Sequence, residues 1–378
     1  LDLASILTAH WPRFAASHRH LLTRAHYRAA DAVISCRTPA LGAQVYRCGD
    51  CAKVHFAYHS CNHRACLKCG GQAQAEWTAA QEAKLLPVSY FMLTFTLPEQ
   101  LRRFAYQHQA WFYDALFAAM SSTLNTFARD AKHLGGTPGF TAVLHTWTRK
   151  LAYHPHLHVI MPGVVLSEDG LSLRRAKGTK YLFPVKALGV AFRHRLMKLI
   201  MAHDKAEGTR HLSQIDPQVW RIPWVVDSRG VGNGQAAVRY LARYVNKTAL
   251  SEQRLLGYDA AGNLRLNCQS SATGEWTSIT LTPDEFLRRW CQHILPKGLM
   301  RVRHYGFLSA AAKAKLARLR HILGVLTLPR PPAPEPLVIK CGCCAKPMRL
   351  VGRTDPPPLW RLMLSGTQPK RGPPPTTP

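Results

Sequence analysis

Acidic residues and long apolar runs are both scarce in this chain. Its 378 residues hold 21 Asp and Glu against 50 Lys and Arg, a formal net charge of +29. Such a chain is attracted to polyanions, and its binding should weaken steeply with salt. Its apolar runs, such as residues 90–97, fall far short of the ~20 residues that a membrane-spanning helix needs. Nucleic acid is therefore a better candidate partner than a membrane, although charge alone leaves a ribosomal or membrane-surface protein open.

Two further signals are missing from the sequence. We find no signal peptide and no phosphate-binding loop of the form Gly-x-x-x-x-Gly-Lys-Ser/Thr. We therefore expect a cytoplasmic protein without a nucleotide cofactor or a fused helicase. The chain begins at Leu1 rather than at a methionine, which leaves its natural N-terminus open.

Cysteine, in contrast, is plentiful. Eleven cysteines, several in Cys-x-x-Cys pairs, indicate thiolate metal ligands in a reducing compartment rather than disulfides. Cys48 and Cys51 form one pair, and Cys66 and Cys69 form another, with fourteen residues between the pairs. This spacing suits one tetrahedral zinc ion, and four thiolates leave no open position for a substrate. The sequence therefore predicts a structural zinc site of these four cysteines.

Other cysteines leave alternatives to this site. Cys61, with His59 and His63 beside it, could replace a thiolate or serve a second ion. Cys36 stands alone, and we expect a buried thiol there. The late pair Cys341 and Cys344 cannot close a site by itself, so a second zinc ion with borrowed ligands and free thiols both stay open.

Two short motifs in the middle of the chain carry the chemistry. Residues 154–160 read His-Pro-His-Leu-His-Val-Ile; on a strand, His156 and His158 point to the same face. Residues 240–247 read Tyr-Leu-Ala-Arg-Tyr-Val-Asn-Lys; on a helix, Tyr240, Tyr244 and Lys247 share a face. Taken alone, each motif is more often a surface pair or packing, but their joint occurrence in a basic chain favours catalysis.

This pairing resembles the HUH endonucleases, and the two-tyrosine form over roughly residues 20–310 resembles the insertion-sequence ninety-one family of rolling-circle transposases. Residues 60–69 look like the zinc module of that family, with Leu67 where proline is common. The resemblance implies an α+β fold with a ferredoxin-like (RRM-like) antiparallel sheet, helices on one face and an N-terminal zinc-binding module. It also implies Mg²⁺ or Mn²⁺ at His156 and His158.

The same resemblance implies a reaction. Tyr240 or Tyr244 would attack single-stranded DNA at the element ends and the target site and form a 5′-phosphotyrosine, with Lys247 positioning the phosphate. A third metal ligand is expected, with His154 and Gln235 as candidates, whereas His145 could be a core or hydrogen-bonding residue. We expect phosphate contacts from a set of basic residues, although a solvated surface explains such charges equally well: Arg64, Lys68, Arg239, Arg243, Lys297, Arg301 and Arg303.

Periodicity and turn signals divide the chain into four parts. We expect a helix and zinc module over 1–82, the nuclease core over 83–250, a basic hairpin and helical extension over 251–328, and a proline-rich, largely disordered tail over 329–378. Within the core we expect strands at 89–98, 140–147 and 156–165, and helices at 99–133 and 236–247. Residues 282–285 read Thr-Pro-Asp-Glu and predict a helix start.

Two rival functions stay open at this point. A plasmid or phage replication initiator would share the nuclease motifs, and a zinc-dependent DNA-binding regulator would keep the fold without the reaction. The expected location is the cytoplasm, in association with the nucleoid. The recognised DNA sequence and the oligomeric state are not encoded in any motif.

Overall fold

The computed structural model describes residues 1–245, 250–270, 273–325 and 338–356. It divides into two compact units, each made of segments that are distant in sequence. One unit combines Leu1–Gly71, Leu250–Ile294 and Pro332–Pro378, and the other combines Gln72–Ala249 and Leu295–Pro331. This division differs from the four consecutive segments that the sequence predicted.

The second unit is built on a five-stranded antiparallel sheet with the strand order β12-β4-β5-β3-β8. Its strands are β3 (Tyr90–Thr96), β4 (Gly139–Trp147), β5 (Tyr153–Pro162), β8 (Val226–Gly230) and β12 (Val302–Gly306), and a small side sheet pairs β6 (Val164–Leu166) with β7 (Leu173–Arg175). Its helices are α3 (Gly71–Glu82), α4 (Arg102–Gln107), α5 (Gln109–Arg129), α6 (Val185–Glu207), α7 (Gln235–Val245) and α9 (Lys313–Ile322).

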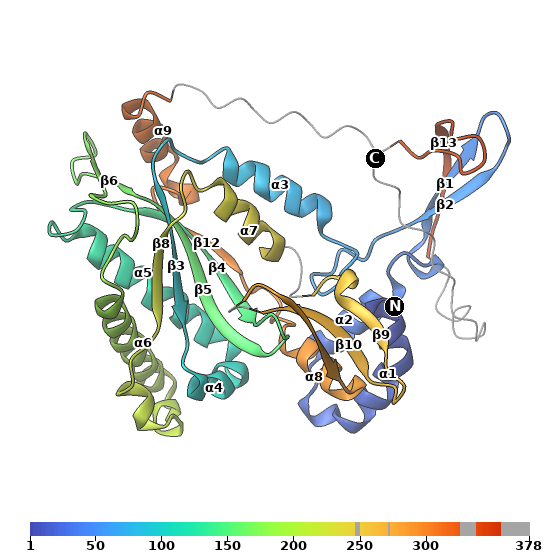
Figure 1. Cartoon of the computed structure of the whole chain (residues 1–378), viewed down its shortest axis with the longest axis horizontal. Coiled ribbons are helices and arrows are strands. Elements are labelled where there is room, and N and C mark those ends of the chain that lie inside the picture. The colour runs from blue at the N-terminus through green and yellow to red at the C-terminus, as the bar shows by residue number, and fades with distance from the viewer. Residues whose placement is uncertain (246–249, 271–272, 326–337, 357–378) are drawn as a thin grey trace. The chain divides into compact units, whose positions relative to one another are not determined.

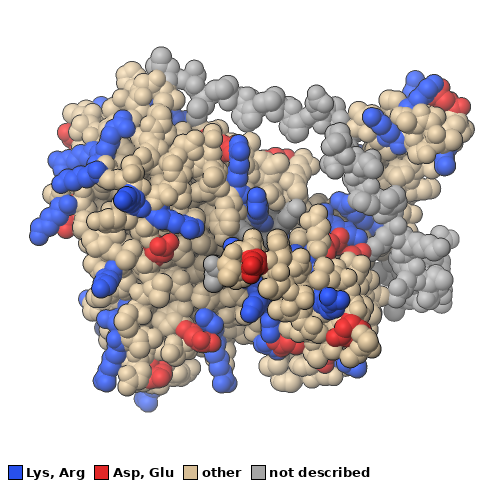
Figure 2. Space-filling model, in the orientation of Figure 1, with Lys and Arg blue, Asp and Glu red and all other residues tan. Residues whose placement is uncertain are grey.

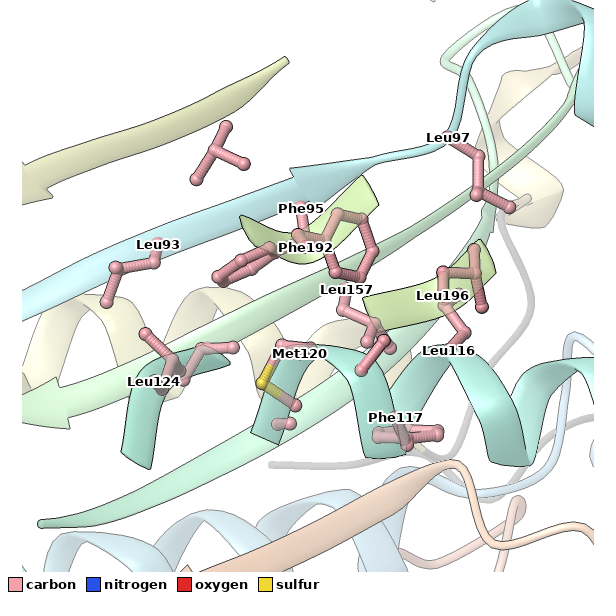
Figure 3. Close-up of a cluster of buried hydrophobic side chains, with 14 of the residues drawn as sticks. Leu93, Phe95, Leu97, Leu116, Phe117, Met120, Leu124, Leu157, Phe192 and Leu196 are labelled. Atoms are coloured by element: carbon pink, nitrogen blue, oxygen red, sulfur yellow. The ribbon is translucent and has the colours of Figure 1, made fainter. Parts of the chain in front are cut away.

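One face of this sheet is covered by α5 and α6 (Figure 1). Leu93, Phe95 and Leu157 point from the strands into a core that also contains Leu116 of α5 and Phe192 of α6 (Figure 3). All five side chains are fully buried. This cluster holds the sheet rigid from one side, because large apolar side chains of both layers interlock there.

The other face is covered in part by α7. Val238 and Leu241 of α7 pack on Val143 of β4 and Ile160 of β5. The sequence predicted helices on one face only, but in the structure they lie on both, because Val143 and Ile160 give the face that carries the histidines an apolar part on which α7 packs.

Gly234 sets the start of α7. Its carbonyl accepts the N–H of Val238 at 2.9 Å, and its φ is +83°. A Cβ at this position would lie 2.7 Å from the ring of Tyr90. Only glycine combines this left-handed backbone with so close an approach, so Gly234 anchors the helix against β3.

Several elements differ from those that the sequence predicted. The long helix expected at 99–133 is interrupted, because His108 takes a non-helical conformation with φ −119° and ψ 32° between α4 and α5. The basic stretch 301–306, expected in an extension, contributes the edge strand β12 to the core sheet. Neither α6 nor β8 was predicted from the sequence.

The first unit contains two three-stranded sheets and three helices in its described residues. The helices are α1 (Leu3–Ser17), α2 (Arg24–Ser35) and α8 (Pro283–Gln292); one sheet has the order β11-β10-β9, with β9 (Leu255–Tyr258), β10 (Leu264–Gln269) and β11 (Trp276–Leu281), and the other has the order β13-β1-β2, with β1 (Ala43–Cys48), β2 (Val54–Tyr58) and β13 (Met348–Thr354). Residues 255–281 therefore form three strands where a short hairpin was expected. Among the described ranges, no helix is both long and apolar enough to cross a membrane.

The C-terminal part differs from the predicted tail. Residues 338–356 include the strand β13, which pairs with β1. The predicted linker at 329–336 and the residues after 356 lie outside the described part of the chain.

Candidate active site

Three histidines meet on the face of the core sheet that α7 covers. His145 lies on β4 directly opposite His156 on β5, and His158 follows two residues later on the same face. One ring nitrogen from each of the three lies within 4.8 Å of the others, a separation at which they could share a metal ion. Side chains at pairing positions of adjacent strands are close neighbours, so the strand register brings the three together.

The Nδ1 atoms of His156 and His158 lie within hydrogen-bond distance of neighbouring groups. Nδ1 of His156 donates to the carbonyl of His154 at 2.7 Å, and Nδ1 of His158 lies 3.0 Å from the hydroxyl of Thr94 on β3. Metal-binding histidines usually have such a partner, which fixes the tautomer and leaves Nε2 for the ion. The donor set therefore fits a divalent cation.

Burial keeps these imidazoles neutral. Desolvation lowers the pKa of His156 to about 4 and holds the pKa of His158 and His145 well below the ordinary value. The neighbouring histidines add to the effect at His158 and His145. Because only the neutral imidazole can bind a metal, all three are ready to do so at neutral pH.

His145 is a candidate ligand that no sequence motif indicated. We expected a core or hydrogen-bonding residue at this position and named His154 and Gln235 as candidates. His154 is not a member of the group, although its ring centroid lies 5.1 Å from that of His156. Gln235 is exposed, and its side chain accepts a hydrogen bond from Asn233 at 3.4 Å. The identity of the partner of His156 depends on strand register, which no local motif encodes.

Tyr240 lies beside this group. Its ring stands edge-on to His158, with 6.1 Å between ring centroids and 89° between ring planes. It is half-buried and lies on α7, whose apolar side packs on the sheet. The backbone of Tyr244 lies in the same helix, but its side chain and all of Lys247 lie outside the described part of the chain.

Eight cysteines of the first unit form two groups rather than one. Cys66 and Cys69 meet Cys36 and Cys61, whereas Cys48 and Cys51 meet Cys341 and Cys344. The predicted site that combined Cys48 and Cys51 with Cys66 and Cys69 is therefore wrong in its grouping. The reason is that Cys36, at the end of α2, and Cys61 complete the later pair, while β13 brings other thiols to the earlier pair.

In the group of Cys36, Cys61, Cys66 and Cys69, the sulfur of Cys69 lies 3.5 Å from that of Cys36 and 3.7 Å from that of Cys61. Four sulfurs around a zinc ion at 2.3 Å are separated by about 3.8 Å. Cys36, expected as an isolated buried thiol, thus lies among potential ligands. His59 and His63 are not members of either group.

The basic residues proposed for DNA contact fall into two kinds. Arg64, Arg243 and Lys297 are exposed. Of the remaining residues, Lys68 pairs with Asp2, Arg239 with Glu82 and Arg303 with Asp114, while the buried Arg301 lies over the ring of Trp147 at 5.2 Å. Figure 2 shows basic side chains outnumbering acidic ones on the visible face. Positive charge is therefore spread over this face rather than confined to one site.

Comparison with known proteins identifies two families that match this chain. Residues 139–315, which include the histidine group and α7, match a family described as "Putative transposase", and residues 6–97 match a family described as "Transposase zinc-binding domain". The first match covers β4, β5 and Tyr240. The second covers the group completed by Cys36 and Cys61.

Curated relatives extend the match over most of the chain. A protein of Sinorhizobium fredii, "Putative transposase y4qJ", is 34% identical over 349 residues, which cover 87% of this chain and 86% of the relative. The transposase for insertion sequence element IS801 of Pseudomonas savastanoi is 31% identical over 288 residues, which cover 73% of this chain and 68% of the relative. No solved structure matches the chain significantly.

The matched families and relatives thus identify a transposase with an N-terminal zinc-binding domain. The chain belongs to the IS91 family of transposases.

Proposed function

We propose that this transposase is a two-tyrosine, metal-dependent endonuclease and strand transferase of the rolling-circle type, acting on single-stranded DNA. The observation that carries the proposal is the position of the Tyr240 ring, 6.1 Å from the ring of His158 in a buried three-histidine group. A nucleophile beside a candidate metal site on a rigid sheet is what phosphodiester cleavage requires.

The chemistry follows from these residues. The phenol oxygen of Tyr240 attacks the phosphorus of a DNA phosphodiester and loses its proton, the bond from phosphorus to the 3′ oxygen breaks, and that oxygen leaves as a protonated 3′-hydroxyl. The product is a 5′-phosphotyrosine, whose bond conserves the energy of the phosphodiester, so that rejoining needs no nucleotide. His145, His156 and His158 would hold a Mg²⁺ or Mn²⁺ ion, which would supply charge neutralisation at the phosphate, and three imidazoles suit Mn²⁺ better than Mg²⁺.

Contacts within the protein align the histidine rings and Tyr240. The bond from Nδ1 of His156 to a backbone carbonyl holds one ring, and Thr94 holds His158. The packing of α7 on β4 and β5 holds Tyr240 at this edge of the histidine group. Tyr244 follows four residues later in the chain, so a second phenol is available for a second strand. Lys247 is proposed to position the phosphate on the same grounds of spacing.

The zinc module has a separate role in the proposal. Cys36, Cys61, Cys66 and Cys69 bind one zinc ion that is structural, because four thiolates fill its coordination sphere. Arg64 of the first unit, and separately Arg243 and Lys297 of the second unit, are exposed and contact the DNA backbone.

The test is a search for the covalent intermediate. Purified full-length protein is mixed with labelled single-stranded oligonucleotides that tile the DNA flanking its gene, with Mn²⁺ or with EDTA, and the products are separated on denaturing gels. We expect a metal-dependent protein–DNA adduct that disappears when Tyr240→Phe and Tyr244→Phe are combined. The matched control is Tyr181→Phe, since Tyr181 is an exposed tyrosine of the same unit outside the proposed site.

The rival functions give other results. A zinc-dependent regulator binds the same oligonucleotides and forms no adduct with any metal. A replication initiator forms the adduct, but only on DNA outside the segment that moves with the gene. An adduct that persists in the double tyrosine variant would show that another residue is the nucleophile.

A further inference from the structure

A six-residue pattern occurs twice, near the two ends of the chain. Residues 48–53 read Cys-Gly-Asp-Cys-Ala-Lys, and residues 341–346 read Cys-Gly-Cys-Cys-Ala-Lys. The two copies differ only at their third position, Asp50 against Cys343. The family match to a zinc-binding domain covers residues 6–97 and thus contains only the first copy.

Both copies adopt the same turn. The N–H of Cys48 donates to the carbonyl of Lys53 at 2.9 Å, and the N–H of Cys341 donates to the carbonyl of Lys346 at 2.8 Å. The alanine after each second cysteine has a left-handed backbone, with φ 54° at Ala52 and 57° at Ala345. This conformation is unfavourable for a non-glycine residue, so its occurrence in both copies indicates a turn that its surroundings enforce.

The turns direct backbone N–H groups at the sulfurs. The amides of Cys51 and Asp50 bond to the sulfur of Cys48, and those of Cys344 and Cys343 bond to the sulfur of Cys341. The amides of Lys53 and Lys346 bond to the sulfurs of Cys51 and Cys344. Such donors stabilise thiolates, the form that binds a metal.

The four sulfurs converge. The sulfur of Cys51 lies 3.4 Å from that of Cys341 and 4.0 Å from that of Cys344, and the sulfurs of Cys48 and Cys344 are 3.5 Å apart. These separations bracket the roughly 3.8 Å of a tetrahedral zinc–thiolate centre. They are much longer than the roughly 2.05 Å of a disulfide.

The surrounding sheet supports this convergence. β13 pairs antiparallel with β1, and Cys48 lies opposite Met348 at one end of the ladder. Cys48 and Cys341 are buried together with Met348. Lys346 of the second turn forms an ion pair with Asp50 of the first at 3.0 Å.

We propose that Cys48, Cys51, Cys341 and Cys344 bind a second structural zinc ion, distinct from that of the zinc module, which fastens the C-terminal segment to the N-terminal β-hairpin. A three-stranded sheet of this size buries little apolar surface, so it depends on a staple for stability. The ion joins two turns that lie far apart in the sequence, and the C-terminal segment thereby becomes part of the sheet that contains β1 and β2. This inference does not depend on the nuclease proposal, because metal content is measured without DNA.

The experiment measures zinc per chain by mass spectrometry of the metal in purified full-length protein after removal of loosely bound ions. We expect two zinc ions per chain. Cys341→Ser with Cys344→Ser should lower the content from two to one, and so should Cys61→Ser with Cys66→Ser. The matched control Cys343→Ser removes an exposed thiol of the same turn and should leave two ions bound.

A conservative variant covers the case in which the serine variant is insoluble. Cys344→His keeps a potential ligand, so two Co²⁺ ions should still bind, and the visible absorption of one of them should change as a sulfur is replaced by a nitrogen. A zinc content that stays the same in the double serine variant, or a Co²⁺ spectrum unchanged by Cys344→His, would overturn the proposal.

Discussion

His145 shows how much a single side chain can depend on its neighbours. In sequence it belongs to an apolar strand, and nothing nearby suggests a ligand. In the structure its ring centroid lies 4.5 Å from that of His158 and 5.3 Å from that of His156. The ring of His145 also stacks on that of Trp147, with 7° between the planes, and Arg301 lies over the ring of Trp147. This stack holds His145 toward its partners on β5.

We therefore predict that His145→Gln weakens metal binding. Loss of one of three ligands should raise the Mn²⁺ concentration needed for half-maximal adduct formation by at least about 10- to 100-fold, the range seen even for outer partners of metal ligands. The measurement is a Mn²⁺ titration of the adduct on denaturing gels. His154→Gln is the control, because His154 is near His156 but outside the group. Equal metal requirements for the two variants would remove His145 from the site.

The burial of a second histidine, His304, should make the free energy of unfolding depend on pH. Burial lowers the pKa of His304 to about 4, and the charge of Lys84 adds to this effect. Nδ1 of His304 lies 2.9 Å from the hydroxyl of Thr141. The unfolded chain takes up this proton near pH 6.5, whereas the folded chain does not until about pH 4. The unfolded state thus binds more protons in this window, so the free energy of unfolding rises with pH across it.

Accordingly, His304→Asn should make that dependence shallower. The stability contributed by neutral His304 is fully present above about pH 6.5 and decreases as the pH falls toward 4. Denaturant unfolding at several values between pH 7.5 and 5 measures the slope for the natural chain and the variant. Identical slopes would mean that His304 is not desolvated in solution.

At the scale of elements, helix α8 illustrates what a local signal can predict. The Thr-Pro-Asp-Glu start at 282–285 was predicted from sequence, and α8 begins at Pro283 with the hydroxyl of Thr282 accepting the N–H of Glu285 at 3.2 Å. The carboxylate of Glu285 binds Arg288 and Arg289. The hydrogen bonds from Arg288, and then that from Arg289 and the charges of both, lower the pKa of Glu285 to about 2. The cap is thus confirmed, while the glutamate serves later residues of the helix.

The cap leads to a stability prediction. Thr282→Ala should lower the free energy of unfolding by about 1 kcal/mol, because an N-terminal amide of the helix loses its acceptor. Thr282→Asp should retain most of the stability, since its carboxylate can accept the same bond. Denaturant melts of the three proteins, followed by circular dichroism, measure the difference. A neutral effect of the alanine would show that solvent replaces the hydroxyl without cost.

Strand β12 shows where local signals fail. Its basic residues suggested a phosphate-binding extension, yet Val302–Gly306 pairs with Gly139–Val143 of β4, far away in sequence. Arg303 uses its guanidinium for Asp114 and lies over the ring of Phe117 at 4.1 Å. A basic residue can serve packing and ion pairing as readily as DNA, and only its surroundings distinguish the two.

On the scale of the whole molecule, charge is the dominant property. A net charge of +29 predicts strong electrostatic attraction to any polyanion, whatever its sequence. The logarithm of the association constant for single-stranded DNA should therefore fall linearly with the logarithm of the salt concentration. The slope counts the phosphates that are neutralised, at about 0.7 for each contact on a single strand.

Substitutions should separate DNA contacts from internal ion pairs. Arg243→Gln, at an exposed position of α7, should make this slope shallower by about 0.7. Arg303→Gln is the control, because the guanidinium of Arg303 is already engaged with Asp114. Fluorescence anisotropy from 50 to 200 mM salt, the range in which such slopes are steep, measures both. A slope that Arg243→Gln leaves unchanged would assign Arg243 to the solvated surface.

The sequence by itself determined the elements that carry chemistry. The histidine motif predicted a strand and the tyrosine motif predicted a helix, and β5 and α7 contain them. These motifs are local: alternation on a strand and helical spacing depend on residues a few positions apart. The family and its zinc-binding module could be inferred for the same reason, since their motifs lie within short segments.

Tertiary structure alone decided which segments meet. The register of β4 on β5 placed His145 opposite His156, and a shift by one residue would have turned it to the other face. Likewise, the pairing of β13 with β1 brought Cys341 and Cys344 to Cys48 and Cys51, and left Cys36 and Cys61 to complete the other group. Contacts of this kind join residues that are far apart in the chain, and they arise from the packing of whole elements, which no spacing within one motif records.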